Sequence, residues 1–345
     1  MDSGSGGEAV TAPASSQTGS RPLAWPTVAG LLVLLLLAAA ARLCVGSFAL
    51  GLPEDAGGAR AVLGLRAERL RVGAVVGAAL ATAGVALQTL LRNPLAEPFL
   101  LGLSTAAALG MVVQWWVADA LGLATGAGYA GALLGAMVCT AVVFAAGRRG
   151  GVLDPLALLL TGVVIGTLNG AAIMLLVKLK PGLLRDDLAN WMMGFLRVGG
   201  DPWPLRITAA VLIAVLTVLG TRTRALDILT LPPAQAAALG VAVGRLRTLL
   251  FLVSGVLAAG AVVLAGPVAF VGLIAPHLAR VGFGPAHARL LPASVALGAA
   301  LVVLADTAGA AAALAFGVGV IPLGVFTALI GGVSFLWLLR GVERA

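Results

Sequence analysis

Long apolar runs separated by short polar stretches organise this chain. An α-helix needs about 20 apolar residues to cross a bilayer, and ten runs approach that length. They are residues 25–47, 70–91, 99–118, 127–147, 155–177, 203–221, 246–264, 267–282, 290–309 and 320–340. The run at 267–282 is short and also fits a re-entrant segment, and the stretch from Asp186 to Val198 fits an interfacial helix. The pattern predicts an all-α fold, a polytopic membrane protein of about ten transmembrane helices.

Composition excludes an ordinary soluble domain. Of the 345 residues, 60% are hydrophobic and 10% are charged, and the mean hydropathy is +1.08. A soluble surface needs more charge than this, whereas a lipid-facing surface does not. Residues 1–22 are rich in Ser, Gly, Ala and Thr, and they are predicted to be a disordered cytoplasmic tail. Residues 23–345 then form one transmembrane domain in contact with membrane lipid.

Charge indicates how the chain is oriented. The formal net charge of +8 comes almost wholly from arginines that flank the apolar runs, which indicates membrane topology and not nucleic-acid binding. With the N-terminus inside, most arginines fall in inner loops, so both termini are predicted to be cytoplasmic. Two predicted outer loops break the rule, and their cations either snorkel at helix ends or dock an acidic partner. They are Arg60, Arg66, Arg69 and Arg71 in one loop and Lys178, Lys180 and Arg185 in the other.

Catalytic and metal-binding patterns are missing from the sequence. Cys44 and Cys139 are isolated in apolar runs, and His277 and His287 are not spaced for metal ligation. No nucleophile elbow, H-E-x-x-H motif or paired-carboxylate pattern occurs. We therefore expect that the chain is not an enzyme and binds neither a metal nor a cofactor.

A proline-containing break follows the second predicted span. Its prolines remove backbone hydrogen-bond donors, so the segment is not regular helix. Broken backbone at membrane depth is either buried in protein or lines a water path, and a plain cytoplasmic turn is the alternative. The residues of this candidate pathway or helix-break motif are Gln88, Asn93, Pro94, Glu97 and Pro98.

Weak internal similarity suggests a repeat. Trp-Pro opens both the first and the sixth span, and Arg-Leu-Arg opens both the second and the seventh. Because the two halves would start on opposite sides of the membrane, the pattern indicates an inverted five-plus-five repeat, which is a common plan for transporters. Short matches of this kind also arise by chance.

Several ordered blocks carry a resemblance to a known family. They are Gly77 to Gly102, Trp191 to Gly194, Gly266 to Arg280 (GPVAFVGLIAPHLAR), Leu304-Ala305-Asp306 and Pro322 to Gly331. Over about residues 60–341 the chain resembles the FecCD-type permease family of ABC importers for ferric siderophores, haem and vitamin B12. The resemblance implies a multi-pass protein of a bacterial cytoplasmic (inner) membrane with ten transmembrane helices.

The resemblance also implies partners. A second permease subunit, identical or paralogous, completes the pore, two ATPase subunits bind on the cytoplasmic side, and a substrate-binding lipoprotein docks outside. The chain lacks the G-x-x-x-x-G-K-[ST] loop that holds nucleotide phosphates. ATP and Mg are therefore expected on the partner ATPase.

Two candidate sites carry over from the family. Arg66 and Arg69 match an arginine pair that faces acidic groups on the binding protein, although Glu68 replaces the intervening proline and Ala310 replaces a third arginine. The second site is a coupling segment, about residues 226–244, in which two prolines replace a Gly-Glu pair. Its expected contacts with the ATPase are Pro232, Pro233, Ala234, Gln235, Ala236, Ala237, Leu239 and Gly240.

The leading functional prediction is ATP-driven import of a ferric siderophore by alternating access. The spans are dominated by Ala, Gly, Val and Leu, which suits a wide pore with weakly adhesive walls and no group that would bind bare iron. Vitamin B12 and haem satisfy the same argument. A secondary transporter is the alternative of another class, and it would need buried coupling groups, for which Glu97 and Asp306 are the candidates.

Overall fold

The computed structural model describes residues 25–46, 51, 55–124, 128–149, 152–180, 191–319 and 321–342, so the predicted tail at 1–22 lies outside the described residues. The prediction of an all-α fold is confirmed, because helices dominate every described stretch. Apart from the helices, β1 (Arg148–Arg149) and β2 (Val152–Leu153) form a short antiparallel hairpin. The helices are α1 (Trp25–Cys44), α2 (Ala56–Leu91), the 3-10 helix η1 (Pro98–Leu101), α3 (Leu103–Ala120), α4 (Tyr129–Ala146), α5 (Pro155–Leu179), α7 (Trp203–Gly220), α8 (Thr223–Leu229), α9 (Pro233–Ala238), α10 (Val243–Ala265), α11 (Val271–Phe283), α12 (His287–Phe316) and α13 (Leu323–Val342).

Each of the ten predicted spans overlaps one of the long helices or α11. Seven described helices, α1, α2, α4, α5, α7, α10 and α12, are long and apolar enough to cross a membrane. The 13 residues of α11 rise only about 20 Å, which is less than the hydrocarbon core of about 30 Å. The shortness that the sequence indicated at 267–282 is therefore real, and the chain is a polytopic membrane protein.

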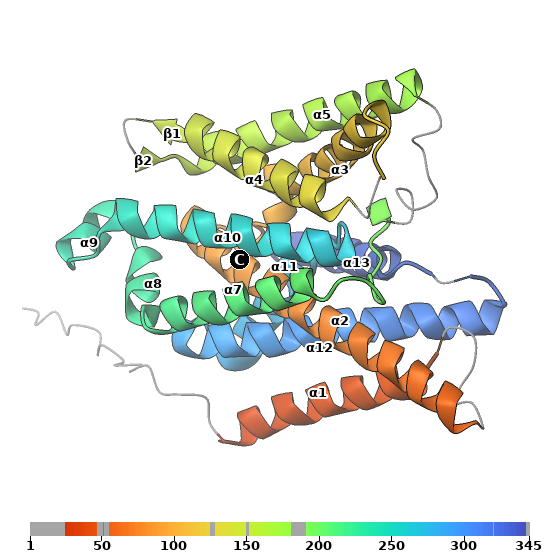
Figure 1. Cartoon of the computed structure of the whole chain (residues 1–345). Coiled ribbons are helices and arrows are strands. Elements are labelled where there is room, and N and C mark those ends of the chain that lie inside the picture. The colour runs from red at the N-terminus through yellow and green to blue at the C-terminus, as the bar shows by residue number, and fades with distance from the viewer. Residues whose placement is uncertain are drawn as a thin grey trace, which may run out of the picture.

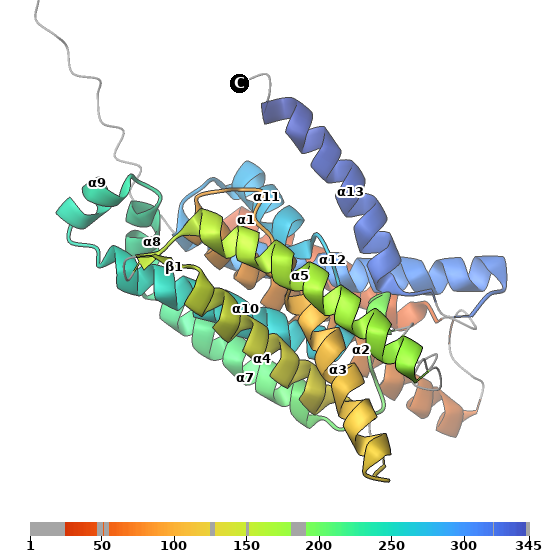
Figure 2. The same cartoon turned by 90° about the horizontal axis from the view of Figure 1, so that it is seen from above.

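The helices form layers around α2 (Figures 1 and 2). In Figure 1, α3, α4 and α5 make an upper layer, α7, α10 and α12 lie with α2 in the middle, and α1 runs below. Every residue of α2 from Val76 to Leu91 is buried. A Cβ on Gly77 would lie 2.1 Å from the carbonyl oxygen of Gly298 on α12, so the backbones of α2 and α12 touch. Small residues permit this approach where lipid provides no hydrophobic drive.

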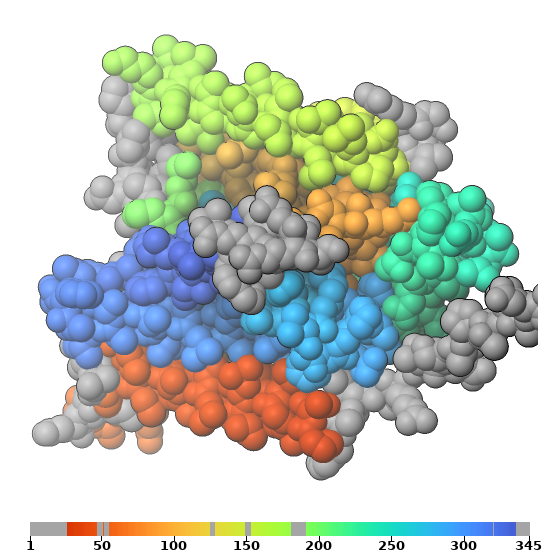
Figure 3. Space-filling view, turned by 180° about the vertical axis from the view of Figure 1, so that it is seen from behind, coloured from red at the N-terminus to blue at the C-terminus, as the bar shows by residue number. Residues whose placement is uncertain are grey.

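The two ends of the helix bundle differ. The short helices α8 and α9 and the β1–β2 hairpin gather at one end, which we call the coupling end (Figure 1). In the space-filling view from behind, α8 and α9 (teal) project at this end (Figure 3). The C-terminus of α1 and the N-terminus of α2 lie at the opposite end of the bundle, which we call the α1–α2 end (Figure 1).

Two sequence predictions about connections need correction. The stretch before residue 70 is not an outer loop, because α2 begins at Ala56 with Asp55 as its N-cap, and the Asp55 carboxylate accepts from Gly58 N at 2.6 Å. The arginines of this stretch led to the prediction of a loop, although most of its residues are good helix formers. Of the predicted interfacial helix at 186–198, residues 186–190 lie outside the described residues, and residues 194–198 are not helical. There Phe195 N donates to Ala265 O at 2.8 Å.

Candidate functional site

The break between α2 and α3 is fastened to the start of α11. Gln88 Nε2 on α2 donates to Ala96 O at 3.3 Å and to Gly272 O at 3.1 Å. The buried Glu97 carboxylate accepts from the backbone N of Phe270, the N-cap residue of α11. A carboxylate at a helix N-terminus is also favoured by the helix dipole. The break therefore ties α2 and α11 together at one point.

The remaining predicted residues shape the turn. Asn93 Oδ1 accepts from Leu95 N at 2.9 Å, which is an Asx turn. Pro94 is exposed, whereas Pro98 is buried, and a Cβ on Gly272 would lie 2.9 Å from Pro98 Cδ. Gln88, Glu97 and Pro98 are buried in protein, whereas the exposed Pro94 also fits a turn at the end of the bundle. A role in the transport pathway stays a prediction.

A buried ion cluster lies towards the α1–α2 end. Asp306 Oδ2 on α12 is 2.5 Å from Arg42 Nε on α1, and Asp306 Oδ1 is 2.7 Å from Arg69 Nη2 on α2. The side chains of Arg42 and Asp306 are 3% exposed and that of Arg69 is 13% exposed. The Arg69 guanidinium also lies 5.0 Å from the centre of the Phe195 ring. One carboxylate thus joins three helices.

Arg66 and Arg69, the predicted docking pair, are engaged inside the chain. Arg66 is buried, and its Nη1 donates to Leu43 O at 2.7 Å and to Cys44 O at 3.1 Å. The sequence interpretation that these arginines stand on an exposed loop is wrong, because both belong to α2 and face α1 and α12. Docking of a binding protein by this pair stays a prediction, and it must compete with the internal bonds.

The predicted coupling segment forms two short helices at the coupling end. Pro233 is the first residue of α9, and Gly240, with φ +80°, follows its end, so the predicted proline start and glycine end of a short helix are confirmed. Ala236 is buried, whereas Leu231 is 37% and Leu239 is 59% exposed. Contact of this surface with an ATPase stays a prediction.

Two connections join α8 to the long helices. Asp227 Oδ1 lies 2.6 Å from His287 Nδ1 and 2.9 Å from His287 N, and His287 Nε2 lies 2.8 Å from Thr89 Oγ1. Arg92 Nε at the end of α2 donates to Leu229 O at 3.1 Å. Burial raises the pKa of Asp227, but the hydrogen bonds and charge of His287 outweigh it and hold that pKa below its ordinary value. The sequence alone does not indicate this group, because 60 residues separate Asp227 from His287.

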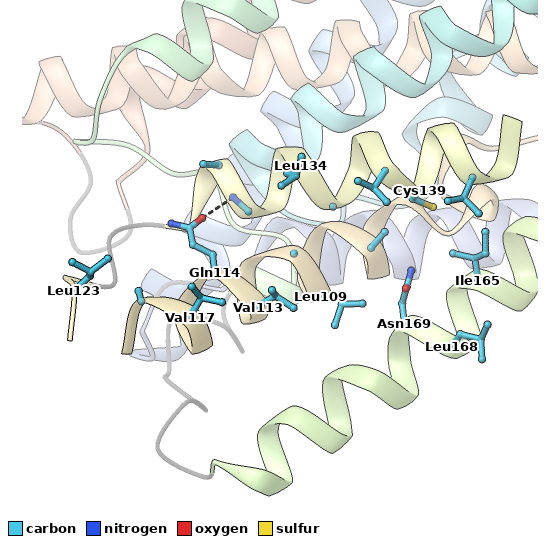
Figure 4. A pocket seen from close by; sticks show the side chains of 18 of the residues that line it. Leu109, Val113, Gln114, Val117, Leu123, Leu134, Cys139, Ile165, Leu168 and Asn169 are labelled. Atoms are coloured by element: carbon cyan, nitrogen blue, oxygen red, sulfur yellow. Dashed lines mark hydrogen bonds between the residues drawn. The ribbon is translucent and has the colours of Figure 1, made fainter. Parts of the chain in front are cut away.

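A largely apolar cavity of about 840 Å³ lies among α3, α4 and α5 (Figure 4). Its polar side chains are few, and both have partners. Gln114 Oε1 accepts from Gly131 N at 2.6 Å, and Asn169 Nδ2 donates to Thr105 Oγ1 at 3.4 Å. The apolar lining includes Leu109, Val113, Leu134, Ile165 and Leu168. A role of this cavity in transport stays a prediction.

Comparison with known proteins gives consistent matches. A family model described as the FecCD transport family matches residues 29–341. The chain is 38% identical over 296 residues to the cobalamin import system permease protein BtuC of Halobacterium salinarum, covering 85% of this chain and 76% of that protein. It is 36% identical over 281 residues to the hemin transport system permease protein HmuU of Yersinia pestis, covering 80% and 82%.

A solved structure extends the match to the fold. The chain superposes with a TM-score of 0.79 and 29% identity on a protein described as a metal-chelate type ABC transporter in an inward-facing conformation, covering 92% of this chain and 100% of that one. The family model covers most of the chain, and both named relatives exceed 30% identity over at least three quarters of their length. The chain therefore belongs to the FecCD transport family.

Proposed function

We propose that this chain is the membrane-spanning permease subunit of an ABC importer for a metal chelate. Membership of the FecCD family is the observation that carries the proposal. It is supported by the segment around α9, where Leu231 and Leu239 on either side of the helix are exposed. The same segment is tied to α2 and α12 by hydrogen bonds, as expected of a surface through which a partner moves the bundle.

The working assembly contains two permease subunits, two ATPase subunits and an external binding lipoprotein in the cytoplasmic membrane of a bacterium. ATP and Mg belong to the ATPase, and this chain contributes the path. Both termini and the coupling end face the cytoplasm. A secondary transporter is less suited to these residues, because Asp306 is held by two arginines and Glu97 by a backbone N–H, whereas a coupling carboxylate must exchange its ion.

The cargo is a chelate that is already closed around its metal. A ferric siderophore remains the prediction from the sequence, and cobalamin and haem are supported by the names of the two relatives. All three are bulky and need width more than specific ligands. The cavity among α3, α4 and α5 offers apolar walls and two amides that already have partners, which would let such a solute pass without holding it.

Uptake by reconstituted transporter tests both levels of the proposal. The chain is co-expressed with candidate ATPase and binding-protein subunits from its own organism, placed in liposomes, and offered labelled cobalamin, haem and a ferric siderophore with and without internal ATP. ATP-dependent uptake of one chelate assigns the cargo. Uptake that requires an ion gradient and does not depend on ATP would overturn the assignment to ABC importers. Uptake of cobalamin or haem alone would overturn the siderophore prediction.

A further inference from the structure

The α2 and α12 helices are joined at two levels along the length that they share. They are antiparallel neighbours whose backbones touch at Gly77 and Gly298. Arg69 and Asp306 join them towards the α1–α2 end, and Thr89 and His287 join them at the coupling end. These junctions are 20 residues apart on α2, about 30 Å of helix, which is close to the thickness of a hydrocarbon core. Two packed helices joined in this way resist sliding against each other.

The junction at the coupling end includes the predicted coupling segment. Asp227 lies on α8, and its Oδ1 receives both the backbone N–H and the ring Nδ1 of His287, at 2.9 and 2.6 Å. His287 is the first residue of α12 and is 3% exposed. The carboxylate thus satisfies an N–H at the start of α12 that has no partner within the helix. Movement of α8 therefore acts directly on the start of α12.

The far side of the His287 ring reaches α2. Its Nε2 lies 2.8 Å from Thr89 Oγ1, and Thr89 Oγ1 is 2.7 Å from Val85 O. When the Thr89 hydroxyl donates its only proton to Val85 O, Thr89 Oγ1 can only accept a hydrogen bond from the ring. His287 Nε2 is then the donor. If Nε2 is unprotonated, the hydroxyl turns from Val85 and donates to the ring. Because Nδ1 donates to the Asp227 carboxylate in both cases, the chain of bonds persists with either form of the ring.

We propose that the Asp227–His287–Thr89 chain is the link through which the coupling segment moves α2 and α12 as one body. The inference rests on the proposed function, and it makes His287 a positioning residue that touches neither nucleotide nor cargo. Leu229 O and Arg92 Nε give α8 a second bond to the end of α2, so α8 remains attached when the first link is cut. Loss of the link therefore impairs transmission of movement without releasing the segment.

Thr89→Val tests the link with a matched control. Valine keeps the branched shape of threonine and removes its hydroxyl. Thr82→Val is the control, since Thr82 is also buried on α2, seven residues and two turns away, and its hydroxyl donates to Ala78 O at 2.8 Å, with no bond from it to another helix among the described residues. Thr89→Ser restores the hydroxyl. His287→Asn retains a donor near the Nδ1 position and removes Nε2.

The measurement is chelate taken up per ATP hydrolysed in the reconstituted complex, for whichever of labelled cobalamin, haem and ferric siderophore the wild type transports. We expect Thr89→Val and His287→Asn to keep thermal stability, assembly and basal ATP hydrolysis close to those of Thr82→Val. Their uptake per ATP should fall about tenfold, as the loss of one buried hydrogen bond permits. Thr89→Ser should recover most of it, and the double variant should be no worse than either single variant.

The outcomes separate the link from the proposed function. If wild-type transporter shows no ATP-dependent uptake of any of the three chelates, the proposed function fails and the link fails with it. If the wild type works and Thr89→Val matches Thr82→Val in uptake per ATP, the link alone is refuted. The same holds if Thr89→Ser does not restore coupling, or if Thr89→Val lowers stability and uptake in proportion, because the hydroxyl would then serve only the fold.

Discussion

Arg69 on α2 holds Asp306 on α12 through both carboxylate oxygens, with Nη2 2.7 Å from Oδ1 and Nε 3.2 Å from Oδ2. This bidentate pairing fixes the relative orientation of the two side chains as well as their separation. Arg42 on α1 adds a third bond to the same carboxylate at 2.5 Å. Asp306, in the Leu304-Ala305-Asp306 block that resembles a family motif, thus joins the helices α1, α2 and α12.

Asp306→Asn should destabilise the protein strongly. The change leaves Arg42 and Arg69 as buried cations without a counter-charge, and breaking one side of a buried ion pair costs about 3–5 kcal/mol. We expect a markedly lower melting temperature in detergent and a lower yield of folded protein. Asp201→Asn is the control, since Asp201 is exposed. Equal melting temperatures for the two variants would show that the cluster contributes little to stability.

Sequence patterns were sufficient for the helices and insufficient for their partners. Each apolar run contains a helix, because a helix satisfies its own backbone hydrogen bonds in apolar surroundings, whether these are lipid or protein. The start of α2 was missed, because Arg60, Arg66 and Arg69 resembled loop cations when no partner for them was known. Asp306 lies 237 residues from Arg69 and 264 residues from Arg42 along the chain. The spacing of apolar residues cannot predict an ion pair between residues so far apart in the sequence.

The same limit applies to the candidate sites. Pro233 and Gly240 predicted the ends of α9 correctly, since both effects are local to the backbone. Gln88 and Glu97 were singled out as polar groups at membrane depth, but their partners, Gly272 O and Phe270 N, come from another part of the chain. His287 was assessed only as a metal ligand, and its link to Asp227 became visible once α8 and α12 were placed together.

Reversal of the predicted docking arginines should act mainly on the fold. Arg66→Glu with Arg69→Glu removes the bonds from Arg66 to Leu43 O and Cys44 O and puts a carboxylate beside Asp306. We therefore expect a lower melting temperature together with lost capture of the binding protein. Arg60 and Arg71 are exposed on the same helix, and their double reversal should leave the melting temperature unchanged.

Binding-protein affinity at low and high salt completes this comparison, because charges at a rim steer encounter and are screened by salt. If Arg60→Glu with Arg71→Glu weakens capture at low salt, these exposed arginines serve docking. If only the Arg66 and Arg69 reversal does so, with an unchanged melting temperature, the predicted pair docks the binding protein after leaving its internal partners.

Ala237→Asp should abolish transport in a folded permease. Ala237 is an exposed residue of α9, and a carboxylate there would meet the ATPase surface without disturbing the bundle. Neighbouring Ala236 is buried, so Ala236→Asp should instead prevent folding of the segment. Uptake, co-purification of the ATPase and melting temperature distinguish the two effects. Normal ATP-dependent uptake by Ala237→Asp would count against a coupling role for α9.

Acid should release α8 from α12 only below the ordinary pKa range of aspartate. The folded-state pKa of Asp227 is depressed, chiefly because its hydrogen bonds with His287 outweigh the effect of burial. A depressed carboxyl pKa stabilises the folded state above the unfolded-state pKa, and this contribution is lost as the pH falls through the folded-state pKa. Hydrogen exchange of α8 amides should therefore show full protection at neutral pH and a loss only in strong acid.

Asp227→Asn is measured beside the wild type at each pH, because the intrinsic exchange rates of the α8 amides are then nearly equal in the two proteins. The ratio of protection between wild type and Asp227→Asn should be constant above the ordinary aspartate pKa and should approach one in acid. A ratio that changes near neutral pH would mean that a group other than Asp227 governs the attachment.

Cysteine labelling should place the coupling end in the cytoplasm. The native Cys44 is exposed and Cys139 is buried, so both are first replaced by alanine. A cysteine at position 237 on α9 should then react with a membrane-impermeant maleimide only after the membrane is opened. A cysteine at position 61, exposed near the start of α2, should react in intact spheroplasts. The physical basis is the excess of arginine in the loops at the coupling end. Labelling of position 237 from outside would reverse the orientation, and the exposed surface of α9 would then be unable to meet a cytoplasmic ATPase.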